Sequence, residues 1–474
     1  MKQRLFAACL ALAVLAPALA SANPEPTSYD SRSIAMGLTG TSFLERPAAL
    51  VINPANLEGI DKLGFTLNFS ALLVKQWAPV RGPNTRLESG LGFGPLPAGF
   101  IAGRIAPRVV FAAGIYIETG YGSDFNQVTC IDGDPVGPGP EYVPDTDPTT
   151  CTNGDAQDLD VSFFVGEFSA GTSIRVTDKF WLGVALRLPF SKQVASLWQN
   201  AGAALGAFGY NRINNNLGGV GFPSPRFGIT WKPHRKVTIG AMYRVYSKIK
   251  LSGTSETGLL MDPATGNPLE LDANADWFIP HAFQVGLAYQ ANERLLLVFE
   301  GRVQFHAANK SGNQNQTVDV TDPTGTIGFP IQPIVVPFGW RNAWSVKVGV
   351  EYRFPVDLLA IRGGVNFARS ATSGEWAQYF TPPPGFSGFL STGLGFYWDD
   401  QTGEQKDKYM FDIAGAFSFS GGTIGNEYID TQATVPGTTN QETLCSASQV
   451  LRTGCPGDVG VFTYFLTAGF TLQY

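Results

Sequence analysis

Apolar and polar residues alternate with a period of two through most of the chain after residue 61. Phe283, Val285 and Leu287, for example, alternate with Gln284 and Gly286. Successive side chains of a β-strand point to opposite faces, so this alternation predicts strands with one apolar and one polar face. The pattern recurs as a unit: two such stretches flank a tight polar turn, and a long polar loop follows.

We count about fourteen of these strands, and bacterial outer-membrane barrels contain an even number. Several runs reach the roughly 9 to 11 residues that cross a bilayer when a strand is tilted, whereas strands of soluble sandwiches usually have about 5 to 6. The sequence therefore predicts an all-β fold, a transmembrane antiparallel β-barrel of about 14 strands. The strands are expected near residues 62–76, 95–105, 108–121, 160–176, 179–190, 223–232, 236–251, 278–290, 294–308, 341–354, 358–369, 388–398, 408–420 and 460–474.

The lengths of the links predict which end of the barrel faces the periplasm. Short links such as Ala106–Pro107 and Thr177–Asp178 alternate with long loops, and short turns belong on the periplasmic side. The last strand ends with Phe470, Leu472 and Tyr474 at alternate positions, similar to the C-terminal strand signal read by the barrel assembly machinery. We therefore expect the bacterial outer membrane as the location, with membrane lipid, lipopolysaccharide and the assembly machinery as partners.

The first residues have the layout of a secretory signal peptide. Lys2 and Arg4 precede an apolar run over residues 5–19, which ends at Ala20-Ser21-Ala22. The run is shorter than the roughly 20 residues of a spanning helix, so cleavage before Asn23 is favoured over a retained anchor. Composition agrees with a β-rich exported chain, because charged residues make up only 15%, aromatic residues 12%, and glycine is abundant at 55 residues.

Several function classes find no support in the chain. A net charge of -6 argues against a nucleic-acid partner. Nucleophile-elbow, phosphate-loop and Cys-x-x-Cys motifs are absent, and His234, His281 and His306 have no metal-ligand spacing. We expect no enzyme activity, no cofactor and no metal centre. An acidic loop that includes Asp132 and Asp145 reads as a solvated surface, with a divalent cation site as the alternative.

Four cysteines remain after the predicted processing: Cys130, Cys151, Cys445 and Cys455. Export leads to an oxidising compartment, and each local pair falls within one predicted loop. We favour Cys130–Cys151 and Cys445–Cys455, and the alternative is that one or both pairs stay reduced.

Residues 23–60 precede the first strand and have no strand period. They contain backbone breakers such as Gly37, Gly40, Pro47 and Pro54 beside apolar residues. A barrel of about fourteen strands encloses a lumen too wide for its own side chains to fill. This segment is therefore interpreted as a plug inside the lumen, with a periplasmic tail as the alternative. The chain then divides into a signal peptide (1–22), an N-terminal hatch (23–60) and a barrel with long extracellular loops (61–474).

The motifs of this segment carry a family resemblance. Ser31–Gly37, Ala48–Leu50 and Asn53–Leu57 resemble the hatch of the FadL/TodX family, outer-membrane transporters of long-chain fatty acids and aromatic hydrocarbons. Leu38 departs from the Gly-Gly that usually follows the family's Met. Two further stretches that resemble the family's barrel are 225–229 and 344–352. The resemblance spans essentially the whole mature chain and implies a monomeric fourteen-stranded barrel, with Asn53, Pro54 and Ala55 as the gating motif of the hatch.

The resemblance also implies a route for hydrophobic cargo without energy input. The loops 191–222 and 252–277 would form the first capture surface, and a kink in the third strand would open the wall sideways. Gly114 is the candidate for that kink, because glycine tolerates a bulged backbone. In the first loop, three- and four-residue steps suggest one helical face, with a loop packed on itself as the alternative. The candidate capture residues are Leu197, Trp198, Leu205 and Phe208.

A fatty-acid cargo would bring a carboxylate, and basic residues on the inward faces are candidate partners for it. The favoured alternative is that most of them pair with lumenal acids such as Glu118, Glu300, Glu351 and Asp412. The candidates are Arg244, Lys248, Arg302, Lys347 and Arg353. A transporter of long-chain fatty acids or other hydrophobic compounds is the favoured function. A structural or adhesive barrel and a general porin remain as alternatives.

Overall fold

The structure is a computed structural model. It describes residues 29–474 except 81–83, 133–143, 146–153, 201–209, 262–267, 309–314, 326–333, 356–357, 375–376, 378, 380, 399–408 and 426–455. Within these described ranges, no helix combines the length and the apolar character needed to span a membrane.

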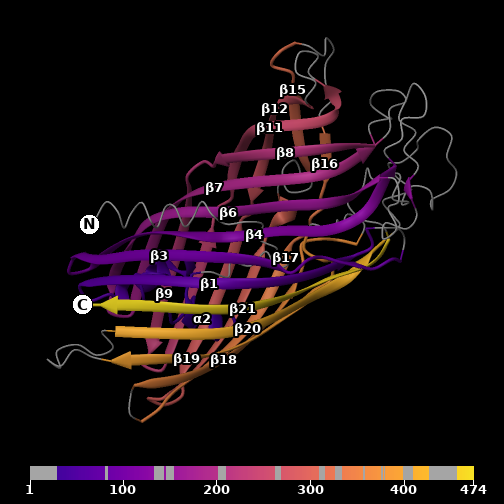
Figure 1. Ribbon diagram of the computed structural model, residues 1–474. Helices are drawn as coiled ribbons and strands as arrows, with labels where there is room; N and C mark the ends of the chain where they lie inside the picture. Colours follow the sequence, from indigo (N-terminus) through magenta and orange to yellow (C-terminus); the bar gives the residue numbers. More distant parts are fainter. Residues whose placement is uncertain are drawn as a thin grey trace.

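Fourteen strands of the described chain form one closed antiparallel barrel (Figure 1). Each strand pairs with the next along the chain, and β21 returns to β1 in a ladder from Gly64 opposite Gln473 to Trp77 opposite Gly460. The predicted all-β antiparallel barrel of fourteen strands is confirmed. In order, the barrel strands are β1 (Leu63–Ala78), β3 (Gly92–Ala106), β4 (Val109–Asp132), β6 (Gly154–Thr177), β7 (Phe180–Asn200), β9 (Ser224–His234), β10 (Val237–Arg244), β13 (Ala282–Gln290), β14 (Leu295–Gln304), β17 (Ala343–Arg353), β18 (Leu359–Arg369), β19 (Phe386–Trp398), β20 (Tyr409–Ile424) and β21 (Gly457–Gln473).

The barrel wall has an apolar outer face and an inner face that is buried. On β13, Phe283 and Val285 are each 43% exposed, whereas Gln284 between them is 4% exposed. Closure of the sheet pairs the backbone N–H and C=O groups between neighbouring strands, which is the condition for a sheet to cross lipid. The outer residues therefore meet lipid and the inner ones meet the contents of the barrel, as the period-two pattern predicts.

Further strands extend the wall beyond the barrel on the long-loop side: β2 (Leu87–Glu88), β5 (Pro144–Asp145), β8 (Tyr210–Val220), β11 (Ser247–Met261), β12 (Pro268–Ile279), β15 (Asn315–Thr321) and β16 (Ile334–Pro337). The predicted single strand over 236–251 is wrong, because β10 ends at Arg244 and a new strand begins at Ser247. β10 pairs with β9 and β13, whereas β11 pairs with β8 and β12. The change of partners explains the break.

The predicted helical face in the 191–222 loop is also wrong. β7 continues to Asn200, and β8 returns beside it in register from Phe190 opposite Val220 to Asn200 opposite Tyr210. Pairing with β7 on one side and β11 on the other satisfies the backbone of β8, although its Asn-rich sequence has low strand propensity. Tertiary pairing therefore overrides the local signal.

The interior has two different halves. Farther from the short turns, aromatic and aliphatic side chains form a large apolar cluster, in which Trp277 lies 4.3 Å from Phe163 and 5.3 Å from Trp340 between ring centroids. Nearer the short turns, the N-terminal segment (residues 29–60) is buried and folds into α2 (Ser31–Ala35), α3 (Ala49–Ile52) and the 3-10 helix η1 (Pro54–Gly59). The short helix η3 (His306–Ala308) follows β14.

Candidate functional site

The N-terminal segment begins η1 with Asn53 and Pro54. The side chain of Asn53 accepts from the Ala55 N–H at 3.2 Å and donates from Nδ2 to the Thr41 carbonyl at 2.8 Å and the Ile229 carbonyl of β9 at 3.0 Å. Proline is suited to the first helical position because that residue needs no N–H partner. Asn53 therefore joins two parts of the segment to the barrel wall at one point.

Inward-facing glycines on eight of the described strands give the N-terminal segment its space. A Cβ at Gly228 would overlap Asn53 and Pro54, and one at Gly364 would overlap the backbone of Met36 and Gly37. Glycine permits this close approach of two backbones. This glycine ring consists of Gly183, Gly228, Gly240, Gly286, Gly349, Gly364, Gly393 and Gly469. Sequence reasoning missed it, although glycine at inward positions of successive strands was its signal.

A buried carboxylate holds the turn of the N-terminal segment that follows Leu38. Glu300 of β14 is 3% exposed and accepts from the backbone N–H groups of Gly40 at 2.7 Å and Thr41 at 2.6 Å. Gln284 of the neighbouring β13 donates to the other oxygen of Glu300 at 2.8 Å. The N–H groups of Gly40 and Thr41 are not part of a β-sheet, and the Glu300 carboxylate supplies the acceptor that these buried donors need.

Ion pairs attach the same segment to the strands that follow β14 around the barrel. Arg32 forms a bidentate pair with Glu351 of β17 at 2.6 and 2.7 Å. Arg46 donates to Asp412 of β20 at 2.5 Å, and Arg362 of β18 bridges Glu351 and Asp412 at 2.6 Å each. Buried charges are tolerated when they are paired in this way. These pairs connect the segment to β17, β18 and β20.

Ser31 connects the segment to the seam where the barrel closes. Its hydroxyl donates to Asn68 on β1 and lies 2.9 Å from the Thr467 hydroxyl on β21. These two strands are the first and the last of the barrel.

Gly37 and Leu38 both adopt left-handed backbone conformations, with φ of +73° and +65°. For leucine this conformation costs about 1 to 2 kcal/mol. The Leu38 carbonyl accepts from Lys347 Nζ at 3.2 Å, and the Leu38 side chain lines a small pocket. The departure from the Gly-Gly of the family is therefore a strained position that places an apolar side chain in the lumen.

A second ion cluster surrounds an irregular point of β4. The register between β4 and β6 shifts between Ile117 and Thr119, so that Glu118 is the extra residue. Glu118 pairs with Arg244 of β10 and, at 3.2 Å, with Arg187 of β7. Arg187 is fully buried and also donates to Glu167 at 2.7 Å. The bulge is thus held by arginines of β7 and β10.

β4 also separates from β3 at this level. The β3–β4 ladder ends with Ala98 opposite Tyr116, whereas β3 stays paired with β1 as far as Gly92 and β4 stays paired with β6 as far as Asp132. Pro95 and Pro97 of β3 lie within the unpaired stretch and lack N–H donors. The Arg104 N–H donates to the Lys62 carbonyl, on the side of β1. N–H groups alternate in direction along a strand and the register with β1 is unbroken, so the missing donors of Pro95 and Pro97 are on the side of β4.

We expected the irregularity of this strand at Gly114. Gly114 pairs regularly with Phe100 and Ser169, and the register shift falls four residues later. The ring of Phe100 occupies the space that a side chain at Gly114 would need. The glycine serves packing between strands at a position where the ladder is intact.

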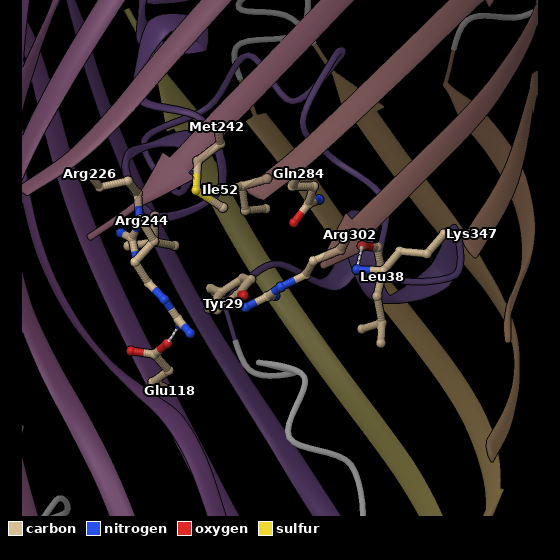
Figure 2. Close-up of a pocket in the computed structure, with 11 residues that line it drawn as sticks. Tyr29, Leu38, Ile52, Glu118, Arg226, Met242, Arg244, Gln284, Arg302 and Lys347 are labelled. Atoms are coloured by element: carbon tan, nitrogen blue, oxygen red, sulfur yellow. Dashed lines mark hydrogen bonds and ion pairs between the residues drawn. The ribbon is translucent and has the colours of Figure 1, made fainter. Parts of the chain in front are cut away.

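A small pocket lies between the N-terminal segment and the wall, in the area that Figure 2 shows. Its volume is about 20 Å³, enough for one or two water molecules. Tyr29, Leu38 and Ile52 line it from the segment, and strands β4, β9, β10, β13, β14 and β17 supply the other side chains. These are Glu118, Arg226, Met242, Arg244, Gln284, Arg302 and Lys347; Val51 completes the lining.

The predicted lumenal cations have different surroundings. Arg244 pairs with Glu118, and Arg353 lies 3.8 Å from Glu351 and over the Tyr397 ring. Lys248 does not face the lumen, which corrects the prediction. It lies on β11, on the face opposite the buried Ile249, and pairs with Asp276 at 2.5 Å. The break after β10 changes the register on which the prediction relied.

The other two predicted lumenal cations are Lys347 and Arg302. Lys347 donates to the Leu38 carbonyl, and Arg302 lines the pocket. Leu197 and Trp198 belong to β7, and Cys130 belongs to β4. Leu205, Phe208, Cys151, Cys445 and Cys455 lie outside the described residues, as does the predicted signal peptide. Among the residues with described positions, no cluster of three or more His, Cys, Asp or Glu is arranged to hold a metal.

A closed barrel with an apolar outer face, occupied by its own N-terminal segment, defines an integral outer-membrane protein. The chain belongs to the family described as outer membrane protein transport protein (OMPP1/FadL/TodX), whose model matches residues 11–405. The resemblance seen in the sequence is confirmed. This is a family of transport proteins rather than of enzymes. No curated protein matches the sequence.

Solved structures share the fold over nearly their whole length. A FadL homologue of Pseudomonas aeruginosa is 18% identical, with a TM-score of 0.68, and the match covers 95% of this chain and 99% of that one. The Ralstonia pickettii toluene transporter TbuX is 17% identical, with a TM-score of 0.64 and coverage of 94% and 99%. The P. putida toluene transporter TodX is 15% identical, with a TM-score of 0.65 and coverage of 95% and 99%.

Proposed function

We propose that this protein carries long-chain fatty acids or other hydrophobic compounds inward across the outer membrane by passive diffusion, and that cargo leaves through the wall between β3 and β4. The observation that carries the proposal is the ladder between these strands, which ends at Ala98 and Tyr116 while the ladders on both sides continue. An unpaired stretch of wall offers apolar cargo a way into lipid that avoids the aqueous periplasm.

The straight path through the barrel is the poorer route. The N-terminal segment acts as the hatch and is attached to β14 through Glu300, to β17 through Glu351 and to β20 through Asp412. The glycine ring brings its backbone against the wall. Opening this path fully would require breaking several buried ion pairs at once, each costly to leave unpaired.

The apolar cluster in the far half of the lumen supports hydrophobic cargo. Trp277, Phe338 and Trp340 contact one another there through their rings. An aqueous pore would line this half with polar side chains, which offer no favourable site to an apolar molecule. Toluene transporters and a monoaromatic hydrocarbon channel are among the proteins of similar structure, which adds support by analogy.

Uptake by cells tests the proposal. Cells that lack the protein are compared with cells that carry the wild-type gene, using a labelled long-chain fatty acid and a labelled aromatic hydrocarbon as cargo. We expect faster uptake of at least one of them with the protein present. Equal uptake in both strains contradicts the transport function and favours a structural or adhesive barrel.

Conductance separates this function from that of a general porin. With the N-terminal segment in place, we expect little current through the purified protein in planar bilayers, and a large steady ohmic current from the intact protein contradicts the hatch. We further propose a monomer without catalytic activity, assembled by the barrel assembly machinery and surrounded by membrane lipid and lipopolysaccharide.

A further inference from the structure

Basic residues lie in pairs along the edge of the barrel that carries the short turns, on the left of Figure 1. At this edge, the residue just before a strand accepts a backbone hydrogen bond of 2.8 or 2.9 Å from the end of the neighbouring strand. At three of the described turns both residues of this contact are cations. These pairs are Arg108 with Arg175, Lys179 with Lys232, and Arg294 with Arg353. Like charges at neighbouring positions of a sheet repel each other, so each pair needs anions nearby.

One member of each pair finds its anion in the barrel. It forms an ion pair with an acid of the N-terminal segment or of the inner face of β17, and its side chain is at most 36% exposed. These ion pairs are Arg175 with Glu58, Lys232 with Glu45, and Arg353 with Glu351. The N-terminal segment and the barrel wall therefore neutralise one half of the basic edge.

The other member of each pair is exposed and forms no ion pair with a carboxylate of the described residues. Arg235, in the turn before β10, is exposed in the same way. We call this group the turn cations: Arg108, Lys179, Arg235 and Arg294. The same four turns contain two acids, Asp178 and Glu293, and a further cation, Lys236. The turns therefore keep an excess of positive charge, although the chain as a whole has a net charge of -6.

The turn cations lie directly beyond the apolar outer face of the barrel. Ile105, beside the first turn, is 70% exposed, and Trp231 and Tyr289, near the ends of β9 and β13, are 47% and 41% exposed. Aromatic residues at strand ends mark the level where the hydrocarbon of a membrane gives way to lipid head groups. Short turns face the periplasm, so this is the level of the periplasmic leaflet. Long basic side chains at such a level reach the head groups while their stems stay in apolar surroundings.

We propose that the turn cations bind the phosphate groups of phospholipids in the periplasmic leaflet of the outer membrane, with a preference for anionic phospholipids. Guanidinium and ammonium groups are the side chains that bind phosphate oxygens. Each cation near an anionic membrane surface strengthens binding by about fivefold. The proposal is independent of the cargo, because it uses only groups on the outside of the barrel.

The arrangement of the turn cations favours lipid over a periplasmic protein as the partner. The four turns follow one another around the barrel, because β4 pairs with β6, β7 with β9 and β10 with β13. Neighbouring turns are thus about two strand spacings apart, roughly 10 Å. Single cations at such intervals and at one level match a layer of head groups that surrounds the barrel, whereas a docked protein would cover a compact patch.

Binding of phospholipids to the purified full-length protein tests the proposal. Native mass spectrometry of the protein in detergent counts the bound lipids as dioleoyl phosphatidylglycerol or dioleoyl phosphatidylcholine is added. The turn variant carries Arg108→Gln, Lys179→Gln, Arg235→Gln and Arg294→Gln. The matched control variant removes the same charge from exposed positions on the long-loop side, with Arg86→Gln, Lys192→Gln, Lys250→Gln and Arg369→Gln. Heat-modifiable migration on gels confirms that both variants are folded.

We expect the turn variant to bind the first phosphatidylglycerol at least about tenfold more weakly than the wild type. Its affinity for phosphatidylcholine should stay unchanged, because that lipid has no net charge. The control variant keeps the affinity of the wild type for both lipids. A third variant with Arg108→Lys, Arg235→Lys and Arg294→Lys keeps the charge and should retain most of the affinity for phosphatidylglycerol.

Four results would overturn the lipid site. They are unchanged phosphatidylglycerol binding by the turn variant, an equal loss of both lipids, an equal loss in the control variant, and a loss in the lysine variant as large as that in the turn variant. Displacement of phosphatidylglycerol by inorganic phosphate at equal concentration also contradicts the proposal, because the turns would then recognise a free anion. None of these results bears on uptake, so the transport function is judged separately.

Discussion

The carbonyl oxygen of Thr41 lies against the α-carbon of Gly240, in the space that the Cβ of any larger residue would fill. Backbone of the N-terminal segment lies equally close to Gly183, Gly228, Gly349 and Gly364, so the segment and the wall fit together there at the level of backbone atoms.

Replacing Gly240 with alanine is expected to displace the N-terminal segment from β10. The added methyl group overlaps backbone, which cannot move aside as a flexible side chain would, and overpacking of this kind costs about 1 to 3 kcal/mol. Single-channel recordings in planar bilayers should show larger or more frequent openings. Gly388→Ala is the matched control, because a Cβ there meets nothing within 4 Å. Identical traces from the two variants would mean that the close approach does not hold the segment.

The Glu300→Gln change is expected to loosen the turn at Gly40 and Thr41. A glutamine has one carbonyl oxygen in place of two charged ones, and its NH2 group faces donors, so about 1 to 3 kcal/mol of attachment is lost. Limited proteolysis of the purified protein should cleave the N-terminal segment sooner than in the wild type. Glu293→Gln, in the exposed turn before β14, serves as control. Unchanged cleavage times would remove Glu300 from the attachment.

The Asp412→Asn change is expected to lower the free energy of unfolding by about 3 to 5 kcal/mol, because Arg46 and Arg362 each lose one of their charged partners in a buried place. Guanidinium titrations of protein folded into lipid vesicles measure this change, with Asp178→Asn in an exposed turn as control. Combining Asp412→Asn with Arg46→Gln should cost less than the sum of the single changes. Strict additivity would show that the pair is not coupled.

The double change Pro95→Ala and Pro97→Ala is expected to slow the uptake of hydrophobic cargo. It restores two N–H donors on the β4 side of β3, so the ladder that stops at Ala98 and Tyr116 can extend and close the wall. Uptake of labelled cargo by cells measures the effect at equal amounts of protein in the membrane. Pro355→Ala, in an exposed turn, is the control. Uptake equal to the wild type with both alanines would place the exit elsewhere.

The sequence predicts the barrel well because one physical rule acts on every strand. Lipid on one side and packed interior on the other force the alternation seen at Phe283 and Gln284, so the strand count and the facing of most residues follow from period two. The rule gives no information where a strand leaves the lipid. For that reason the sequence did not predict the break after Arg244, the outward position of Lys248 or the continuation of β7 to Asn200 in place of a helical face.

The site is less accessible to sequence reasoning than the wall. Glu300 and Gly40 are 260 residues apart, and Glu118 and Arg244 are 126 apart. Nothing local indicates which acid each arginine meets. The general expectation that most lumenal cations pair with lumenal acids agrees with Arg244 and Arg353. Arg302 lines the small pocket and forms no ion pair with a carboxylate of the described residues. Only the three-dimensional structure shows this.

The contacts of Ser31 constrain the order of events when the barrel assembles. Its hydroxyl contacts Asn68 on the strand made first and Thr467 on the strand made last. The serine therefore has both of its wall partners only after the ribosome has completed the chain and the two ends of the sheet have met. Because the rest of the segment fits against glycines on eight of the fourteen barrel strands, we expect the barrel to close around a segment that is already inside it.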